Sequence, residues 1–120
     1  MILADTSVWV DHFRRGDAKL SQHLLNGGIL IHPFVIAELA LGSLADRRKK
    51  LAHLELLPQV TVGRTEEVRS FIEAHALFGR GIGFVDAHLI VSTLLTEHTV
   101  LWTRDRRLRE VAVLAGARIE

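Results

Sequence analysis

The sequence predicts an α/β protein with three layers, in which helices cover both faces of a central, mainly parallel sheet of four to five strands. Two observations lead to this fold class. The predicted strands are continuous apolar runs, typical of strands buried on both faces, and they alternate with helical segments. A length of 120 residues without an internal repeat, a low-complexity segment or a linker predicts one domain over residues 1–120.

The chain begins with a strand and two helices. Residues 2–4 are wholly apolar and predict a buried strand. Thr6 or Ser7 can cap a helix that continues to about Arg15. Asp17 can cap a second, short helix, which the Asn-Gly-Gly sequence at 26–28 ends.

The middle of the chain predicts two more strands and two more helices. Residues 29–31 are apolar and form the second buried strand. Pro33 suits the first turn of a helix that extends to about Leu44. A basic helix over residues 46–56 ends before Pro58, and residues 59–62 predict a short edge strand.

The remaining elements follow the same alternation. Thr65 and the two glutamates after it open a helix that fades near Phe78, since negative charge suits the amino-terminal end of the helix dipole. A glycine-rich loop leads to a nearly all-apolar helix over residues 85–97. The last predicted elements are a strand at 99–103, a helix at 105–114 and a strand at 117–119.

Three apolar segments each carry a single formal charge, and each charge is a carboxylate. Asp5 ends the run MILAD. Glu38 is the only charged side chain between Ile29 and Ala45, and Asp86 the only one between Gly81 and Thr96. Burying an acid costs several kcal/mol unless its charge is compensated. Three such acids predict a common counter-charge, and ligands that are all oxygen indicate Mg²⁺ or Mn²⁺.

The predicted topology brings these acids together. Ligands of open parallel sheets bind beyond the carboxyl ends of the strands. Asp5 lies at the end of the first strand, Asp105 follows the strand at 99–103, and Glu38 and Asp86 lie in early turns of helices. Two carboxylates about 4 Å apart repel by roughly 4 kcal/mol at an effective dielectric near 20, so a cluster of four requires a cation or protonation.

Each acid also has a purely structural interpretation. Asp5 and Asp86 can stabilise the amino-terminal ends of their helices. Asp105 can cap its helix or pair with Arg109. Glu38 has no such local explanation, because it lies in the middle of a helix in the least polar segment.

Composition excludes several classes of protein. Fifteen Lys and Arg against fourteen Asp and Glu give a net charge of +1, which excludes a strongly basic nucleic-acid coat but not a local basic patch. The absence of cysteine excludes disulfides and thiolate metal sites. No apolar run is long enough to span a membrane, and no secretion signal is present, so we expect a cytoplasmic protein without membrane association. The seven histidines lack metal-ligand spacing and are expected to be structural or surface residues, and both tryptophans are expected in the core.

Four strings, MILADTSVWVDHFR, PFVIAELALG, GFVDAHLIVST and VLWTRDRRL, resemble the four motifs of the PIN-domain ribonucleases, and in particular VapC-type toxins of toxin–antitoxin pairs. The resemblance spans nearly the whole chain. It implies a PIN-like domain in which Asp5, Glu38, Asp86 and Asp105 form the catalytic, metal-binding site, supported by the hydroxyl of Ser7 and less so by that of Thr6. It also implies Mg²⁺- or Mn²⁺-dependent cleavage of RNA, in tRNA or rRNA loops, that inhibits translation. The implied partners are a second copy of the chain and a VapB-type antitoxin that neutralises the toxin.

RNA must also be bound, and Arg104, Arg106 and Arg107 flank an acid of the predicted site. The basic run at 47–50 is more typical of a solvated helix face. A receiver-like phosphoacceptor is disfavoured because none of the three lysines follows a strand. A non-catalytic PIN-fold protein that binds RNA or another partner is the remaining alternative.

Overall fold

The computed structural model describes all residues, 1–120, and its centre is a parallel sheet of three strands. The strands are β1 (Ile2–Ala4), β2 (Ile29–Leu30) and β3 (Val100–Trp102), in the order β2-β1-β3. Leu3 of β1 pairs with Leu30 on one side and with Leu101 on the other. Because all strands are parallel, their carboxyl ends lie side by side at the same end of the sheet, its carboxyl edge.

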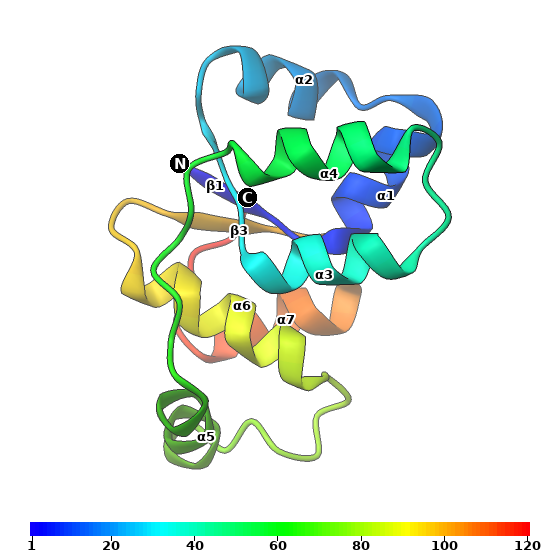
Figure 1. The fold of residues 1–120 in the computed structure, drawn as a ribbon. Coiled ribbons are helices and arrows are strands. Elements are labelled where there is room, and N and C mark those ends of the chain that lie inside the picture. Colours follow the sequence, from blue (N-terminus) through cyan, green and yellow to red (C-terminus); the bar gives the residue numbers. More distant parts are fainter.

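Seven helices surround these strands, and Figure 1 shows them on both sides of the sheet. In that view α2 and α4 lie above the strands, and α6 and α7 lie below them. Helix α3 contacts both α1 and α4, whereas α5 packs on α6 at the lower end of the molecule. The helices are α1 (Thr6–Arg15), α2 (Ala18–Leu25), α3 (Pro33–Leu41), α4 (Arg47–Glu55), α5 (Thr65–Ala74), α6 (Phe84–Leu95) and α7 (Arg106–Leu114).

The core confirms that the apolar runs are buried. All three residues of β1 are buried, and in α6 every residue from Ala87 to Thr93 is buried. One cluster of 23 buried side chains joins the strands to α1, α2, α3, α4, α6 and α7. Trp9 and Trp102 belong to this cluster, as the sequence predicted.

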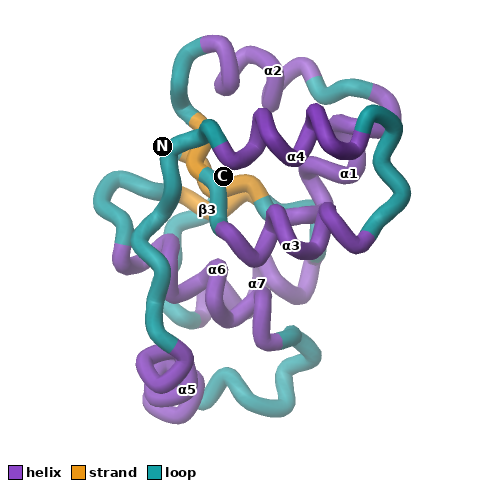
Figure 2. Tube along the Cα trace, viewed as in Figure 1, coloured by secondary structure: helices purple, strands orange, loops and turns teal.

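The prediction of four to five strands is wrong, because two expected edge strands form only single bridges. Gln59 bridges Ile31 and Ile119 bridges Leu101, both in parallel orientation, and Figure 2 shows how little of the chain is strand. The first segment cannot continue beside β2, because the chain after Ile31 enters α3 at Pro33, which has no amide hydrogen to donate. The second cannot lengthen because Ala117 still donates its amide to Ala112, at the end of α7.

Helix boundaries differ from the expected ones at a few ends. Asp5, and not Thr6 or Ser7, caps α1, and Arg64 occupies the cap position of α5. Helix α3 ends at Leu41 and α5 ends at Ala74, each a few residues earlier than expected. Asp17, Pro33 and Asp105 begin their helices as the sequence predicted.

Candidate active site

The carboxyl edge of the sheet carries the predicted acids. Asp5 follows β1 directly, and its amide donates to the carbonyl of Trp102 at the end of β3. Asp105 caps α7, which begins just after β3. Asp86 lies in the first turn of α6, and Glu38 in the second turn of α3. Four elements therefore contribute one acid each, as predicted from the topology.

Asp5 is the most firmly held of the four acids. Its residue is only 6% exposed, and its carboxylate accepts three hydrogen bonds. The Ser7 amide donates to Oδ1 at 2.9 Å, the Ser7 hydroxyl donates to Oδ2 at 3.0 Å, and the Thr103 hydroxyl also donates to Oδ2. The helix-cap interpretation of Asp5 is thus correct. It does not exclude a ligand role, since a carboxylate can accept further partners at its two oxygens.

Glu38 lies at the surface, which differs from the expectation that an apolar segment buries it. In α3 the buried side chains are Val35 and Leu39, and Glu38 is on the exposed face. Its Oε1 accepts a hydrogen bond of 2.6 Å from the Thr6 hydroxyl, at the first residue of α1. Consequently the two adjacent hydroxyls divide their contacts: Ser7 holds Asp5, and Thr6 holds Glu38.

Asp86 is partly buried and lies within electrostatic range of the other three acids. Burial raises the pKa of its carboxyl, and the neighbouring charges of Asp5, Asp105 and Glu38 raise it further, against the opposing effect of the Gly83 amide. That amide donates to Asp86 Oδ2 at 3.1 Å. Because the folded pKa lies above the ordinary value, the ionised form opposes folding. The contribution of Asp86 to stability is therefore lost as the pH rises through this pKa.

Asp105 has the cap role that the sequence offered as one alternative. Its Oδ1 accepts a hydrogen bond of 3.1 Å from the Leu108 amide. The other alternative, a pair with Arg109, is not formed, because Arg109 instead donates to the carbonyl of Thr103 at 3.4 Å. Asp105 is exposed, so its side chain faces solvent at the edge of the site.

Thr103 is a site residue that the sequence did not reveal. It is 2% exposed, and its hydroxyl donates to Asp5 and accepts the Asp105 amide at 3.0 Å. It therefore links the ends of β1 and β3. Its position in the sequence was the available signal. Thr103 is a hydroxyl residue at the end of a predicted strand and two residues from Asp105, just as Ser7 is two residues from Asp5.

The donor set fits a hard divalent cation. All groups are carboxylates and hydroxyls, which are the ligands that Mg²⁺ and Mn²⁺ prefer. The mutual effect on the pKa of Asp86 shows that a positive charge among these acids would relieve repulsion. No three of the acidic or histidine side chains stand in place to hold one ion together, and hydrogen bonds from amides or hydroxyls now occupy all four carboxylates.

The three candidate RNA-binding arginines differ in their surroundings. Arg104 pairs with Asp11, at 2.7 Å from Nε to Oδ2, and also with Asp17. Arg106 pairs with Glu110 one turn along α7, at 3.1 Å. Arg107 forms no ion pair. Phosphate binding by Arg104 would require exchange of two carboxylate partners, and Arg107 is the arginine whose charge is uncompensated.

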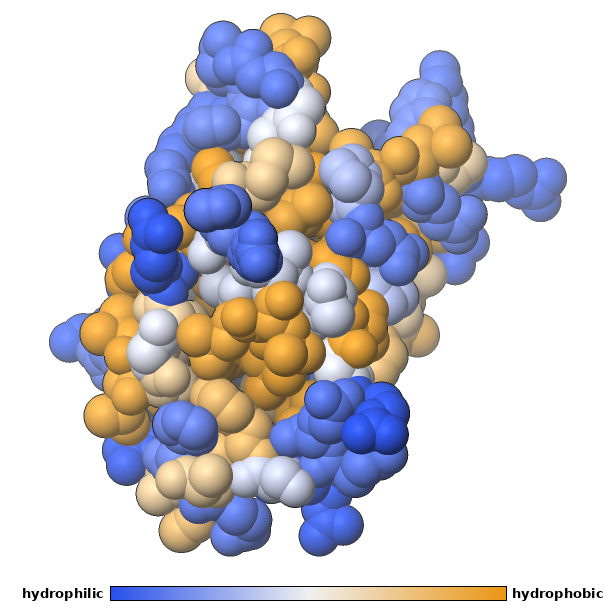
Figure 3. All heavy atoms as spheres, turned by 90° about the vertical axis from the view of Figure 1, so that its left-hand side faces the viewer, coloured by the Kyte–Doolittle hydropathy of each residue, from blue (hydrophilic) through white to orange (hydrophobic).

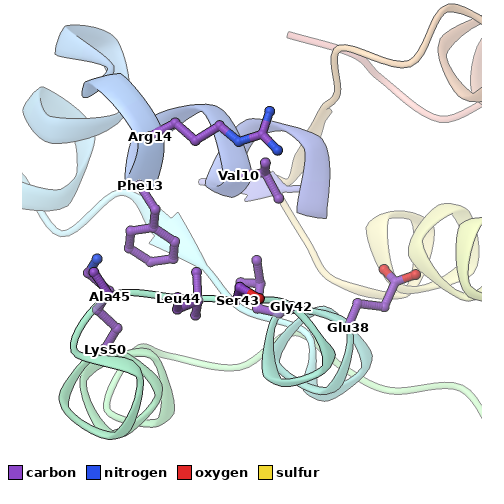
Figure 4. A pocket seen from close by; sticks show the side chains of 10 residues that line it. Val10, Phe13, Arg14, Glu38, Gly42, Ser43, Leu44, Ala45 and Lys50 are labelled. Atoms are coloured by element: carbon purple, nitrogen blue, oxygen red, sulfur yellow. The ribbon is translucent and has the colours of Figure 1, made fainter.

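Glu38 also borders a cavity of about 190 Å³ between α1, α3 and the start of α4. Figure 4 shows Phe13, Leu44 and Val10 on its walls, with Arg14 and Lys50 at its margin. A cavity with both apolar and polar walls thus adjoins Glu38 and carries two cations.

Two buried histidines, His32 and His88, have structural contacts within the folded core. His32 caps α3 through Nδ1, which accepts the Phe34 amide at 2.9 Å. His88 packs between the rings of Phe34 and Phe84. Burial, together with the charge of His88, lowers the pKa of His32 to about 4, so His32 is neutral at pH 7.

Known proteins are similar in sequence to this chain over almost its whole length. The family model described as PIN domain matches residues 2–114. The chain is 44% identical over 116 residues to "Ribonuclease VapC32" of Mycobacterium tuberculosis strain CDC 1551 / Oshkosh, a match that covers 97% of this chain and 94% of that relative. The protein of the same name from strain ATCC 25618 / H37Rv matches to the same extent. No helix of the structure is long and apolar enough to cross a bilayer.

Proposed function

The chain belongs to the PIN-domain family, as a VapC-type member, and from this premise we propose that it is a divalent-metal-dependent endoribonuclease toxin. The observation that supports the proposal is the placement of four carboxylates, from four elements, after or near the carboxyl ends of the parallel strands. Its substrate is RNA, in the loops of tRNA or rRNA, and its effect is to inhibit translation in the cytoplasm.

We assign the cation, Mg²⁺ or Mn²⁺, to Asp5 and Asp86, with Glu38 and Asp105 contributing directly or through water. A divalent cation held by these residues would supply an activated water and positive charge toward the phosphodiester. The residues of the chain supply position. Ser7 and Thr103 fix both oxygens of Asp5, and Thr6 holds Glu38 toward the start of α1.

An antitoxin of the VapB type is the proposed inhibitor, and the cavity beside Glu38 supports it. Its walls include Phe13, Leu39 and Leu44, and it opens beside an acid of the site. An apolar segment of the antitoxin that fills this hollow would also cover Glu38 from RNA.

A homodimer is also part of the proposal. Exposed apolar side chains include Met1, Val62, Leu94 and Leu95, each at least 40% exposed. Figure 3 shows a patch of hydrophobic groups across the middle of one face, bordered by hydrophilic ones. Contiguous exposed apolar surface is typical of a protein interface.

The proposed activity predicts a specific dependence on cations. Purified protein incubated with a panel of tRNAs and rRNA fragments should cleave at least one of them when Mg²⁺ or Mn²⁺ is present, and end mapping should locate discrete sites. Excess chelator should abolish cleavage, and added cation should restore it. Cleavage that persists in chelator would contradict the metal-dependent mechanism, and binding without cleavage under every condition would favour the non-catalytic alternative.

A further inference from the structure

Two exposed aromatic rings stand beside the candidate active site. The chain has five phenylalanines and two tryptophans, and of these only Phe78 and Phe84 are exposed, at 62% and 45%. Water-exposed aromatic rings are characteristic of surfaces that stack nucleic-acid bases. The other strongly exposed apolar side chains, such as Leu25, Leu41 and Leu56, are aliphatic.

Both rings line one cavity. It measures about 210 Å³, and its walls include Ile72, Leu77 and Ile82 in addition to the two phenylalanines. An apolar cavity of about 150 Å³ can hold benzene, so this one has room for a planar ring. The cavity is formed where the loop between α5 and α6, yellow-green in Figure 1, turns into α6.

The cavity adjoins the acidic site through one residue. Gly83 lines the cavity and donates its amide to Asp86 Oδ2. Phe84 is the first residue of α6 and precedes Asp86 by two positions, so the two side chains leave the helix on different sides. A nucleotide whose base occupied the cavity would therefore lie against the same first turn of α6 that carries Asp86.

A cation without an ion-pair partner, Arg107 of α7, packs against the same loop. Gly81 has a φ of +80°, and a Cβ at this position would collide with the guanidinium of Arg107 and lie 3.0 Å from its Cδ. The positive φ favours glycine at residue 81, and the guanidinium of Arg107 packs directly against it. Arg107 forms no ion pair, unlike Arg104 and Arg106, so its charge is available to an anion beside the loop.

We propose that this loop and the first turn of α7 form a nucleotide subsite, in which one unpaired RNA base stacks on Phe84 within the cavity and Arg107 binds the adjoining phosphate. The proposal rests on the proposed ribonuclease function, which it deepens by naming two side chains that would bind one nucleotide of the RNA beside the acidic site. A purely apolar partner would satisfy the phenylalanines but would leave the adjacent charge of Arg107 unpaired.

The test measures binding of labelled RNA by fluorescence anisotropy in an Asp5→Asn background, which prevents cleavage. The probes are an unstructured single strand and a duplex of the same length. Phe84→Leu should weaken binding of the single strand about tenfold, whereas Phe84→Tyr, which keeps the ring, should bind like the parent. Arg107→Gln should also weaken binding and should lower the salt slope of log K by about 1.

Matched controls and parallel assays separate the outcomes. Arg118→Gln is the control for Arg107→Gln. It removes an exposed arginine that follows α7 and lies beside His98 and Thr99, away from the proposed subsite, and it should leave binding unchanged. A Phe84→Leu protein that binds the single strand like its parent, while the wild type cleaves RNA, overturns the subsite alone. So does a Phe84→Leu protein whose only change is its oligomeric mass, since that result assigns the ring to an interface between copies. A wild-type protein that neither binds nor cleaves RNA overturns the proposed function and the subsite together.

Discussion

Asp5→Asn should reduce RNA cleavage by at least about a hundredfold while the protein remains folded. Loss of an outer-shell partner in metal sites costs 10- to 100-fold, so loss of a proposed direct ligand should cost no less. The fold should persist because asparagine can still cap α1: its carbonyl oxygen can accept from the Ser7 amide in place of Oδ1, and its NH2 group, in place of Oδ2, can donate to a hydroxyl of Ser7 or Thr103. The measurement is the initial rate of cleavage of a mapped RNA at saturating Mn²⁺, together with the thermal unfolding curve.

Asp11→Asn is the matched control for this change. Asp11 is an acid of α1 outside the proposed metal site, where it pairs with Arg104 and Arg15. Its replacement should affect stability more than chemistry. Equal losses of activity in the two variants, or full activity of Asp5→Asn, would show that the charge of Asp5 has no special part in cleavage.

Thr103→Val should lower both stability and activity. Valine keeps the shape of threonine but removes the hydroxyl that donates to Asp5 and accepts the Asp105 amide. Because the side chain is buried, the loss should lower the free energy of unfolding by about 1–3 kcal/mol. As the hydroxyl orients a proposed ligand, cleavage should fall about 10- to 100-fold.

A serine at the same position distinguishes a positioning role from a packing role. Thr103→Ser retains the hydroxyl and loses a methyl group, so it should recover most of the activity although it remains less stable. If Thr103→Val cleaves RNA at the wild-type rate, the link between β1 and β3 through Thr103 does not position Asp5. Denaturant unfolding and single-turnover cleavage together provide both readouts.

The central elements were predictable because their signals are local. The apolar runs at 2–4 and 99–103 became neighbouring parallel strands, and Asp17 and Pro33 began helices as expected. The shortness of the strands predicted at 59–62 and 117–119 was not predictable from those segments, because strand length also depends on the neighbouring chain. Pairing beside Ile31 stops where Pro33 begins α3, and no local pattern in residues 59–62 encodes that limit.

The site was predictable in position more than in detail. The order of strands and helices was enough to bring Asp5, Asp86 and Asp105 to one edge. The exposure of Glu38 was not foreseen, because an apolar neighbourhood in the sequence does not fix which face of a helix is buried. The ion pair between Arg104 and Asp17 spans 87 residues, so its effect on the availability of Arg104 emerges only from the fold.

The central claim is that a hard dication compensates clustered carboxylates, and thermal unfolding of the wild type and Asp86→Asn with and without Mn²⁺ tests it most directly. In chelator at pH 7, the variant should unfold at a higher temperature than the wild type, because it lacks the Asp86 carboxyl, whose ionised form opposes folding. Mn²⁺ at 100 times its Kd should stabilise the wild type by about 2.7 kcal/mol and the variant far less. If Mn²⁺ leaves the wild-type Tm unchanged, or raises both Tm values equally, these four acids do not share a cation.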